Sequence, residues 1–191
     1  MGAQRSQGSV NGDGAGAPEQ LVLAIVSKLL SFLACTVILS SAAGAHGSII
    51  YAGGAWAAID RGTTCEALSR SLRVAAKGKM QAIAGFTFSA DLRRWGELHI
   101  RLRRMPRAGA AVMLRIDDRP FLLVSRGNEA WSEGPMQEQA IIAAVRASGG
   151  GMSVESRDVS GGRFIDPYSL DGAATAIDAA AASCAGKMQQ R

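Results

Sequence analysis

An apolar segment near the N-terminus divides this chain into a leader and a domain. Residues 29–39 are almost without polar side chains, Lys28 places a positive charge before them, and residues 43–45 read Ala-Gly-Ala. A basic residue, an apolar run and a small-residue site in this order are typical of a secretory signal peptide. We therefore expect cleavage after Ala45 and export of a single domain, residues 46–191.

The same segment also fits a signal anchor. Residues 21–39 make a stretch of nineteen residues, which is long enough to cross a bilayer of about 30 Å. Lys28 would then lie inside the membrane at a cost of about 3 kcal/mol. Residues 1–20 form a polar extension with Arg5 as its only basic residue, which differs from a short basic leader. Two predictions stay open for residues 1–45: a cleaved signal peptide, which makes the domain periplasmic or secreted, or an inner-membrane anchor.

The predicted exported part is large enough for one domain with a core, and it is basic. Its 146 residues carry 19 lysines and arginines against 14 aspartates and glutamates, so the net charge of +5 is kept when the leader is removed. A surplus of positive charge favours contact with anionic surfaces and does not determine a fold.

Two cysteines, Cys65 and Cys184, lie near the two ends of the exported part. An even number of cysteines in an oxidising compartment favours a disulfide. Closing so long a loop stabilises a protein by about 4–5 kcal/mol in the chain-entropy model. We predict a bridge between Cys65 and Cys184, and the alternative is two buried free thiols.

Alternation of apolar and polar residues predicts a mostly antiparallel β-domain. Residues 97–105 alternate most clearly, so we expect one face of this strand to be buried and the other to face solvent. The inward set is Leu98, Ile100 and Leu102, and the outward set is His99, Arg101 and Arg103. Turn sequences between several apolar runs predict hairpins. The predicted strands cover residues 55–60, 65–72, 81–89, 97–105, 112–116, 121–124, 152–158 and 163–170. For residues 65–72 a helix is the alternative.

Two segments carry helix signals. Pro135 suits the first position of a helix, and the glycines at residues 149–151 end that segment. The alanine-rich residues 173–185 predict a second helix, with Asp171 as its N-cap and Gly186 as its stop. Together these elements predict an α+β fold: about seven to eight mainly antiparallel strands in a sandwich or open barrel, with two packed helices.

The sequence carries no catalytic, metal or cofactor signature that we would defend. His46 falls at the predicted new N-terminus, and His99 alternates with arginines on an outer strand face, where a surface role is expected. A nucleophile pair of Cys65 and His99 would need a free thiol, which the predicted disulfide removes. The glycines at 149–151 follow a helix instead of opening one, so they do not predict a phosphate loop. We therefore predict a protein without enzymatic activity and without a cofactor.

Six arginines lie within fifteen residues, interrupted by Trp95 and His99. Guanidinium groups mixed with rings are typical of surfaces that bind phosphates or carboxylates. Charged side chains also protect strand edges from pairing with other strands. We therefore weigh an anionic envelope lipid or protein partner against a guarded sheet edge, and we do not expect nucleic acid as the partner. The candidate binding residues are Arg93, Arg94, His99, Arg101, Arg103, Arg104 and Arg107.

The domain begins with Trp56 and Cys65, continues as a run of strands, and ends with an aromatic segment before the alanine-rich helix. The positions concerned at this end are Phe164, Tyr168, Ser169, Leu170, Gly172, Ala176, Ala180 and Cys184. This pattern resembles the invasion-associated locus B family of alphaproteobacterial envelope proteins. The resemblance implies a small β-rich periplasmic protein, in a family implicated in host-cell entry and without an accepted enzymatic activity, and it supplies no catalytic residue. The chain differs from the pattern by its arginine-rich strand and by having no further cysteines in the middle of the domain.

These features predict a non-enzymatic binding protein of the periplasm or envelope. One alternative is a small exported hydrolase-like enzyme, which would need a cleft that gathers His99 with a carboxylate. The other alternative is a purely structural envelope protein.

Overall fold

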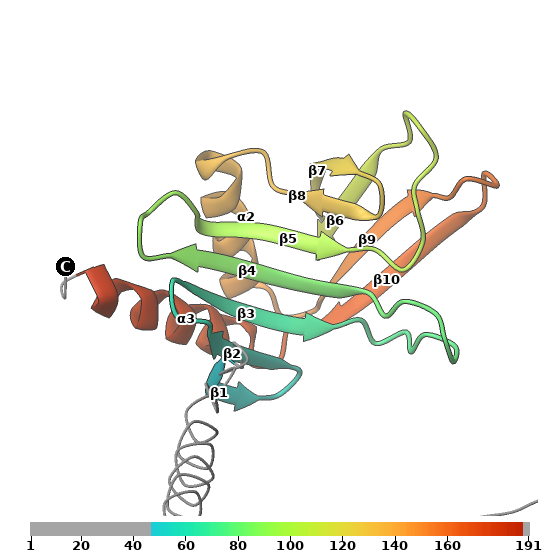
Figure 1. The fold of residues 1–191 in the computed structure, drawn as a ribbon. Helices are drawn as coiled ribbons and strands as arrows, with labels where there is room; N and C mark the ends of the chain where they lie inside the picture. Colours follow the sequence, from blue (N-terminus) through green and yellow to red (C-terminus); the bar gives the residue numbers. More distant parts are fainter. Residues whose placement is uncertain (1–46, 189–191) are drawn as a thin grey trace, which may run out of the picture. The chain divides into compact units, whose positions relative to one another are not determined.

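A computed structural model describes residues 47–188, which form ten β-strands and two α-helices (Figure 1). The strands are β1 (Ser48–Gly53), β2 (Trp56–Asp60), β3 (Thr64–Arg70), β4 (Ile83–Ser89), β5 (Trp95–Arg101), β6 (Val112–Ile116), β7 (Arg119–Arg126), β8 (Glu129–Trp131), β9 (Gly151–Arg157) and β10 (Arg163–Ser169). The helices are α2 (Pro135–Ala147) and α3 (Ala173–Met188). The predicted leader and His46 lie outside the described residues.

The ten strands make one antiparallel sheet in the order β1-β2-β3-β4-β5-β8-β7-β6-β9-β10. The sheet is open, with β1 and β10 as its edges. The sheet curves enough to bring the end of β3 beside β10: the backbone N–H of Leu72, just after β3, donates to the carbonyl oxygen of Pro167 in β10 at 2.8 Å. The predicted α+β class with mainly antiparallel strands is confirmed. The predicted strand count of seven to eight was too low.

The two additional strands are β1 and β8. β1 pairs with β2 through a register irregularity between Ile49 and Tyr51, and its exposed edge residues do not alternate clearly. β8 has three residues, which is too short for a periodic pattern to be recognised. It forms because β5 and β7 pair with it on both sides. Tertiary pairing therefore creates these strands where local sequence gives little signal.

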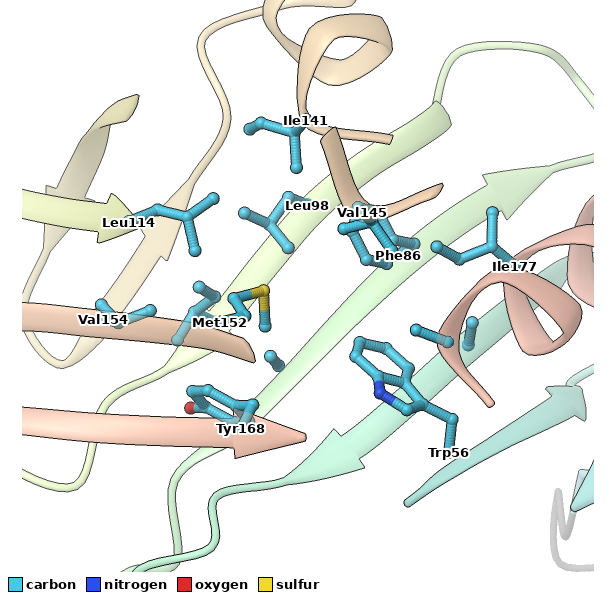
Figure 2. Packing of buried hydrophobic residues seen from close by; sticks show 14 of the residues in the cluster. Trp56, Phe86, Leu98, Leu114, Ile141, Val145, Met152, Val154, Tyr168 and Ile177 are labelled. Atoms are coloured by element: carbon cyan, nitrogen blue, oxygen red, sulfur yellow. The ribbon is translucent and has the colours of Figure 1, made fainter. Parts of the chain in front are cut away.

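The core lies on the face of the sheet that both helices cover (Figure 2). Ile141 of α2 and Ile177 of α3 are buried in the same cluster as Leu98 of β5. Leu98, Ile100 and Leu102 are each 0 % exposed, as their alternation predicts. His99 lies on the opposite, half-exposed face. The predicted inward face of this strand is confirmed.

Helix α2 begins at Pro135 as predicted, whereas α3 continues through Gly186 to Met188. The prediction of Gly186 as a stop was therefore wrong. Glycine inside a helix costs about 1 kcal/mol relative to alanine, and here contacts of Lys187 with the β2–β3 turn hold the last turn in place. Within the described residues the Asp171 carboxylate makes no capping hydrogen bond; the first helical bond runs from the Ala176 N–H to the Gly172 carbonyl. Neither helix of residues 47–188 is long and apolar enough to cross a membrane.

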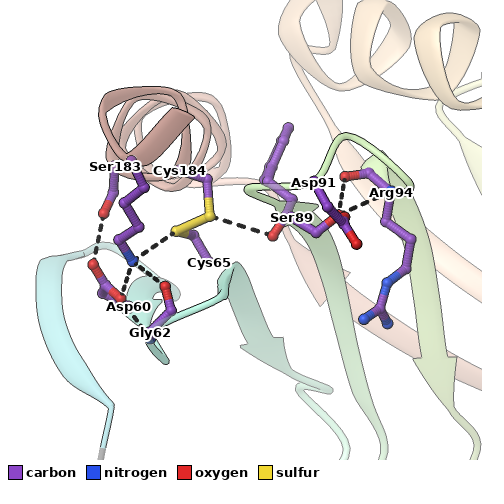
Figure 3. The surroundings of a disulfide bond; sticks show 10 residues. Asp60, Gly62, Cys65, Ser89, Asp91, Arg94, Ser183 and Cys184 are labelled. Carbon is purple, nitrogen blue, oxygen red and sulfur yellow. Dashed lines mark hydrogen bonds and ion pairs between the residues drawn. A yellow bond between two sulfur atoms is a disulfide. The ribbon is translucent and has the colours of Figure 1, made fainter. Parts of the chain in front are cut away.

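A disulfide joins Cys65 of β3 to Cys184 of α3, with the Cα atoms 5.8 Å apart (Figure 3). Lys187 lies one turn further along α3, where it forms an ion pair with Asp60 and donates to the carbonyl oxygen of Gly62 at 2.7 Å. The predicted bridge is confirmed, and it clamps the last helix onto the β2–β3 hairpin. A disulfide of this kind indicates an oxidising, exported environment.

Candidate functional site

The six candidate arginines do not form one site, because β5 separates them. Arg93 and Arg94 lie in the turn before β5, and Arg101 is the last residue of that strand. The other three, Arg103, Arg104 and Arg107, lie in the segment between β5 and β6. Arg101 is half-buried opposite Glu129 of β8, and its Nε has no hydrogen-bond partner within residues 47–188. The other two groups have different surroundings and are described in turn.

The turn before β5 is ordered by a small hydrogen-bond network (Figure 3). The Asp91 carboxylate accepts the Ser89 hydroxyl at 2.6 Å and the backbone N–H of Arg93 at 3.1 Å. The backbone N–H of Arg94 donates to the Ser89 hydroxyl oxygen at 3.1 Å. These bonds, the one from Ser89 above all, hold the pKa of Asp91 below its usual value. The Arg93 guanidinium lies 3.5 Å from Asp91, so it has a local counterion.

His99 lies on the outer face of β5 against two residues of β8. Its Nε2 is 2.7 Å from Oε2 of Glu129, and its ring stacks on Trp131 with the centroids 5.5 Å apart. A carboxylate beside an imidazole orients the ring and is the arrangement that a hydrolase-like enzyme would use. The His99 side chain is 42 % exposed on an open strand face. It lines neither of the two hollows described below.

Arg103 does not face solvent, in contrast to its prediction as an outward residue. Its guanidinium forms a 2.5 Å ion pair with Asp166 of β10 and lies 5.7 Å from the centre of the Phe164 ring. Asp166 is fully buried, and the Arg103 side chain is 16 % exposed. The reason is a contact with another strand: Arg103 follows the end of β5, and Asp166 of β10 accepts its backbone N–H at 3.4 Å as well as pairing with its guanidinium. Arg103 is a structural counterion for a buried carboxylate.

Arg104 is also paired, at 2.6 Å, with Asp158 after β9. The hydroxyl of Ser160 donates to the same carboxylate, as do the backbone N–H groups of Ser160 and Gly162. Hydrogen bonding from Ser160, followed by that from Arg104, lowers the pKa of Asp158 to about 2. Asp158 therefore stays ionised and fixes the β9–β10 turn, with Arg104 as its cation.

Arg107 belongs to a hollow with three arginines that sequence reasoning did not select. We name this hollow, of about 330 Å³, the arginine groove. Its charged lining residues are Arg107 from the loop before β6, Arg115 from β6, Glu155 and Arg157 from β9, and Arg163 from β10. Four cations thus meet around one carboxylate.

Glu155 lies between two of the four arginines. It forms an ion pair with Arg163 and another, at 3.2 Å, with Arg115. Hydrogen bonding from Arg163 in the first place, and from Arg115 in addition, lowers the pKa of Glu155. A single ionised carboxylate balances one positive charge, so the groove keeps a surplus of three.

The strand register places two of these cations directly opposite each other. Arg157 and Arg163 are partners across the β9–β10 ladder. Like charges at directly opposite positions destabilise an antiparallel pair. The Arg157 side chain donates to the carbonyl oxygen of Gly161 at 3.1 Å, which orients it without neutralising it. An anion bound in the groove would relieve this repulsion.

Three arginines of the groove were recognisable in the sequence as residues of predicted strands, although their clustering was not. Arg115, Arg157 and Arg163 occupy exposed positions of strands that the turn sequences beside them predict. Their convergence depends on which strands are neighbours, and β6 pairs with β9 across a long stretch of chain. Clustering along the sequence therefore favoured residues 93–107, while clustering in space involves β6, β9 and β10.

Residues 47–188 contain no group of three or more histidine, cysteine, aspartate or glutamate side chains placed to hold a metal ion. The chain matches no family model, no curated protein sequence and no solved structure. The resemblance to the invasion-associated locus B family therefore stays a prediction.

Proposed function

We propose that this protein is a non-enzymatic binding module of the periplasm or cell envelope, and that the arginine groove recognises anionic groups of an envelope component. The observation that supports the proposal is the direct opposition of Arg157 and Arg163 in a groove that holds four arginines and one carboxylate. A protein that only needed a stable hairpin would gain nothing from this arrangement.

The chemistry of the groove favours phosphate or carboxylate as the recognised group. Arginine presents a planar fork of N–H donors that matches either anion with two parallel hydrogen bonds. Arg115 and Arg163 keep 49 % and 62 % of their side chains exposed, so their remaining donors are accessible. The net charge of +5 would also increase the rate of encounter with an anionic surface.

The hydrolase-like alternative would depend on the pair of His99 and Glu129. A general base acts on a substrate held within hydrogen-bond reach of it. His99 lines neither the arginine groove, nor a cleft near α2, nor the hollow beside Asp91 and Arg94. The binding proposal therefore has the stronger geometric support.

Vesicle binding tests the proposal. The protein should bind vesicles of mixed phosphatidylglycerol and phosphatidylcholine more tightly than vesicles of phosphatidylcholine alone, and added salt should weaken the binding. The double substitution Arg107→Gln with Arg157→Gln should reduce the affinity about tenfold or more, because charge-assisted hydrogen bonds are lost. The control is Arg119→Gln with Arg126→Gln, which removes the same charge from exposed positions of β7.

A soluble probe separates the possible sources of the anion. Binding of glycerol 3-phosphate that the groove variant loses would indicate recognition of the phosphate group itself. Vesicle binding without glycerol phosphate binding would indicate that a membrane surface is required. Equal vesicle binding by the groove variant, the control variant and the parent protein would reject the proposal and favour a structural envelope protein.

A further inference from the structure

A second cleft, of about 670 Å³, opens between the start of β5 and the two helices. We name it the helix–sheet cleft. Its apolar lining includes Phe88, Trp95 and Ile142, and its polar lining includes Glu97, Ser132 and Glu138. This volume and this mixture of rings with a few polar groups are typical of small-molecule sites.

A bulge in β5 shapes the apolar wall of this cleft. Thr87 and Phe88 of β4 pair with Glu97 and Trp95, so Gly96 is an extra residue in β5. Gly96 has a φ of 91°, and a Cβ atom there would lie 2.6 Å from Cδ1 of Ile142. Only glycine combines this backbone conformation with so close an approach of α2. The bulge lets Trp95 lie edge-on to Phe88, with the ring centres 5.4 Å apart, and Trp95 stays 38 % exposed.

Glu138 brings a carboxylate into the cleft from the first turns of α2. It is 8 % exposed. Within residues 47–188 the Ser132 hydroxyl is the one group that hydrogen-bonds its side chain, at 3.5 Å, which is the outer limit for such a bond. The Ser132 oxygen also accepts the backbone N–H of Leu98 at 3.0 Å, which fixes its position. Burial in the first place, and the nearby negative charge of Glu97 in the second, raise the pKa of Glu138.

The two arginines that line the cleft already have counterions of their own. Arg93 lies 3.5 Å from Asp91, and Arg146 of α2 forms an ion pair with Asp178 of α3. In the described part of the chain, neither Glu97 nor Glu138 forms an ion pair. The cleft therefore combines two negative charges without partner cations and an aromatic wall.

We infer that the helix–sheet cleft binds an organic cation, with a primary ammonium group on a short apolar chain as the simplest form. The ammonium group would lie between Glu138 and Glu97 and supply the counterion that both lack. The apolar chain would pack on Trp95 and Phe88, whose ring faces also attract a cation. This site is separate from the arginine groove and selects the opposite charge, so the inference does not depend on the proposed function.

Three six-carbon probes test the charge selectivity. Calorimetric titration at neutral pH should show binding of hexylammonium and much weaker binding of hexanoate and 1-hexanol. Glu138→Gln should weaken hexylammonium binding about tenfold or more, because a charge-assisted contact becomes a neutral one. The matched control is Glu133→Gln, which removes the same charge from an exposed residue beside the cleft and should change little.

NMR of the unchanged protein provides a readout that does not depend on how the variants fold. Hexylammonium should shift the indole N–H resonance of Trp95, which is assigned by comparison with Trp95→Phe. Equal shifts with hexanoate or 1-hexanol would overturn the inference, because the cleft would then be an apolar pocket without charge selection. Unchanged affinity of Glu138→Gln would overturn it as well. The groove variant with Arg107→Gln and Arg157→Gln should keep hexylammonium binding, so the two proposals fail or succeed separately.

Discussion

The two ends of β5 both lead to a carboxylate removed from water, and they differ in what faces it. Beyond the C-terminal end of the strand, Asp166 is fully buried and has the Arg103 guanidinium at 2.5 Å. At the N-terminal end, Glu138 is 8 % exposed and has one long hydrogen bond from a hydroxyl group. A buried charge is costly unless it is paired. The fold itself supplies the cation that pairs with Asp166. For Glu138 it supplies none within the described residues, and we infer that a ligand does so.

The same contrast applies to the arginines of the molecule. Arg103 and Arg104 each have a well-hydrogen-bonded aspartate and belong to the structure of the β9–β10 region. In the arginine groove, Arg107 and Arg157 form no ion pair within the described residues, and two further arginines share Glu155. The balance between cations and counterions, and not the number of arginines, is therefore the criterion on which we propose the arginine groove as the binding site.

The largest expected effect on stability comes from substitutions at the centre of β5, where neighbouring residues lie on the buried and the outer face of the strand. Ile100 is 0 % exposed and Arg101, the next residue, is on the outer face. Ile100→Asp would bury a charge without a partner and should abolish folding, since this cost exceeds the usual reserve of about 5–15 kcal/mol when combined with lost packing. Arg101→Gln, which keeps a polar side chain opposite Glu129 of β8, should change the free energy of unfolding by about 1 kcal/mol or less. Circular dichroism and thermal melting measure both, and a folded Ile100→Asp protein would contradict the assigned faces.

An effect of intermediate size is expected at the paired end of β5. Arg103→Leu would leave Asp166 buried without its cation and should lower the free energy of unfolding by about 3–5 kcal/mol. The matched control is Arg146→Leu, because the Arg146–Asp178 pair is exposed and should contribute about 1 kcal/mol or less.

Adding a second substitution tests whether the unpaired charge of Asp166 causes the loss of stability. Arg103→Leu combined with Asp166→Leu removes both charges and should recover much of the lost stability in urea unfolding. If Arg103→Leu were as mild as Arg146→Leu, the ion pair would not be the reason for the burial of Asp166.

The sequence predicted most of the fold because most of its elements carry their own periodic signal. β5 alternates strictly, turn sequences separate the apolar runs of the hairpins, and α2 begins at a proline. The bridge between Cys65 and Cys184 was predictable from cysteine number and the expected compartment. β8 was not predictable, since its three residues form a strand only because β5 and β7 flank them. The prediction that α3 ends at Gly186 was wrong, because a tertiary contact of Lys187 outweighs the low helix propensity of glycine.

The candidate sites were less predictable, because they depend on strand order. Of the arginines selected from the sequence, Arg107 alone lies in the arginine groove. The partners Arg157 and Arg163 face each other because a hairpin places them in register, and a known register would have identified the like-charge pair. Glu138 gave no signal, because its burial results from packing of α2 against the bulge at Gly96.

The smallest expected effect on stability comes from Glu138, near the N-terminal end of β5, and it depends on pH. Because the pKa of Glu138 is raised in the folded protein, the folded state holds this proton more tightly than the unfolded state does. The contribution of Glu138 to stability therefore falls as the pH rises from the ordinary glutamate value of about 4.3 through the raised pKa. Glu138→Gln removes this loss and should be more stable than the parent by about 1 kcal/mol at neutral pH, with little difference at low pH.

The charged groups around Glu138 do not change the direction of this effect. Glu97 of β5 adds repulsion, and the cleft arginines Arg93 and Arg146 are paired with other carboxylates.

Glu155→Gln is the control with the opposite sign. The pKa of Glu155 is lowered by Arg163 and Arg115, so its ionised form stabilises the fold at neutral pH. Thermal melting of the three proteins from about pH 3 to pH 8 measures both slopes, because the Glu155 contribution changes below the ordinary glutamate value and the Glu138 contribution changes above it. A Glu138→Gln protein that is less stable than the parent at neutral pH would show that the Ser132 contact compensates the buried charge, and it would remove the difference between the two ends of β5.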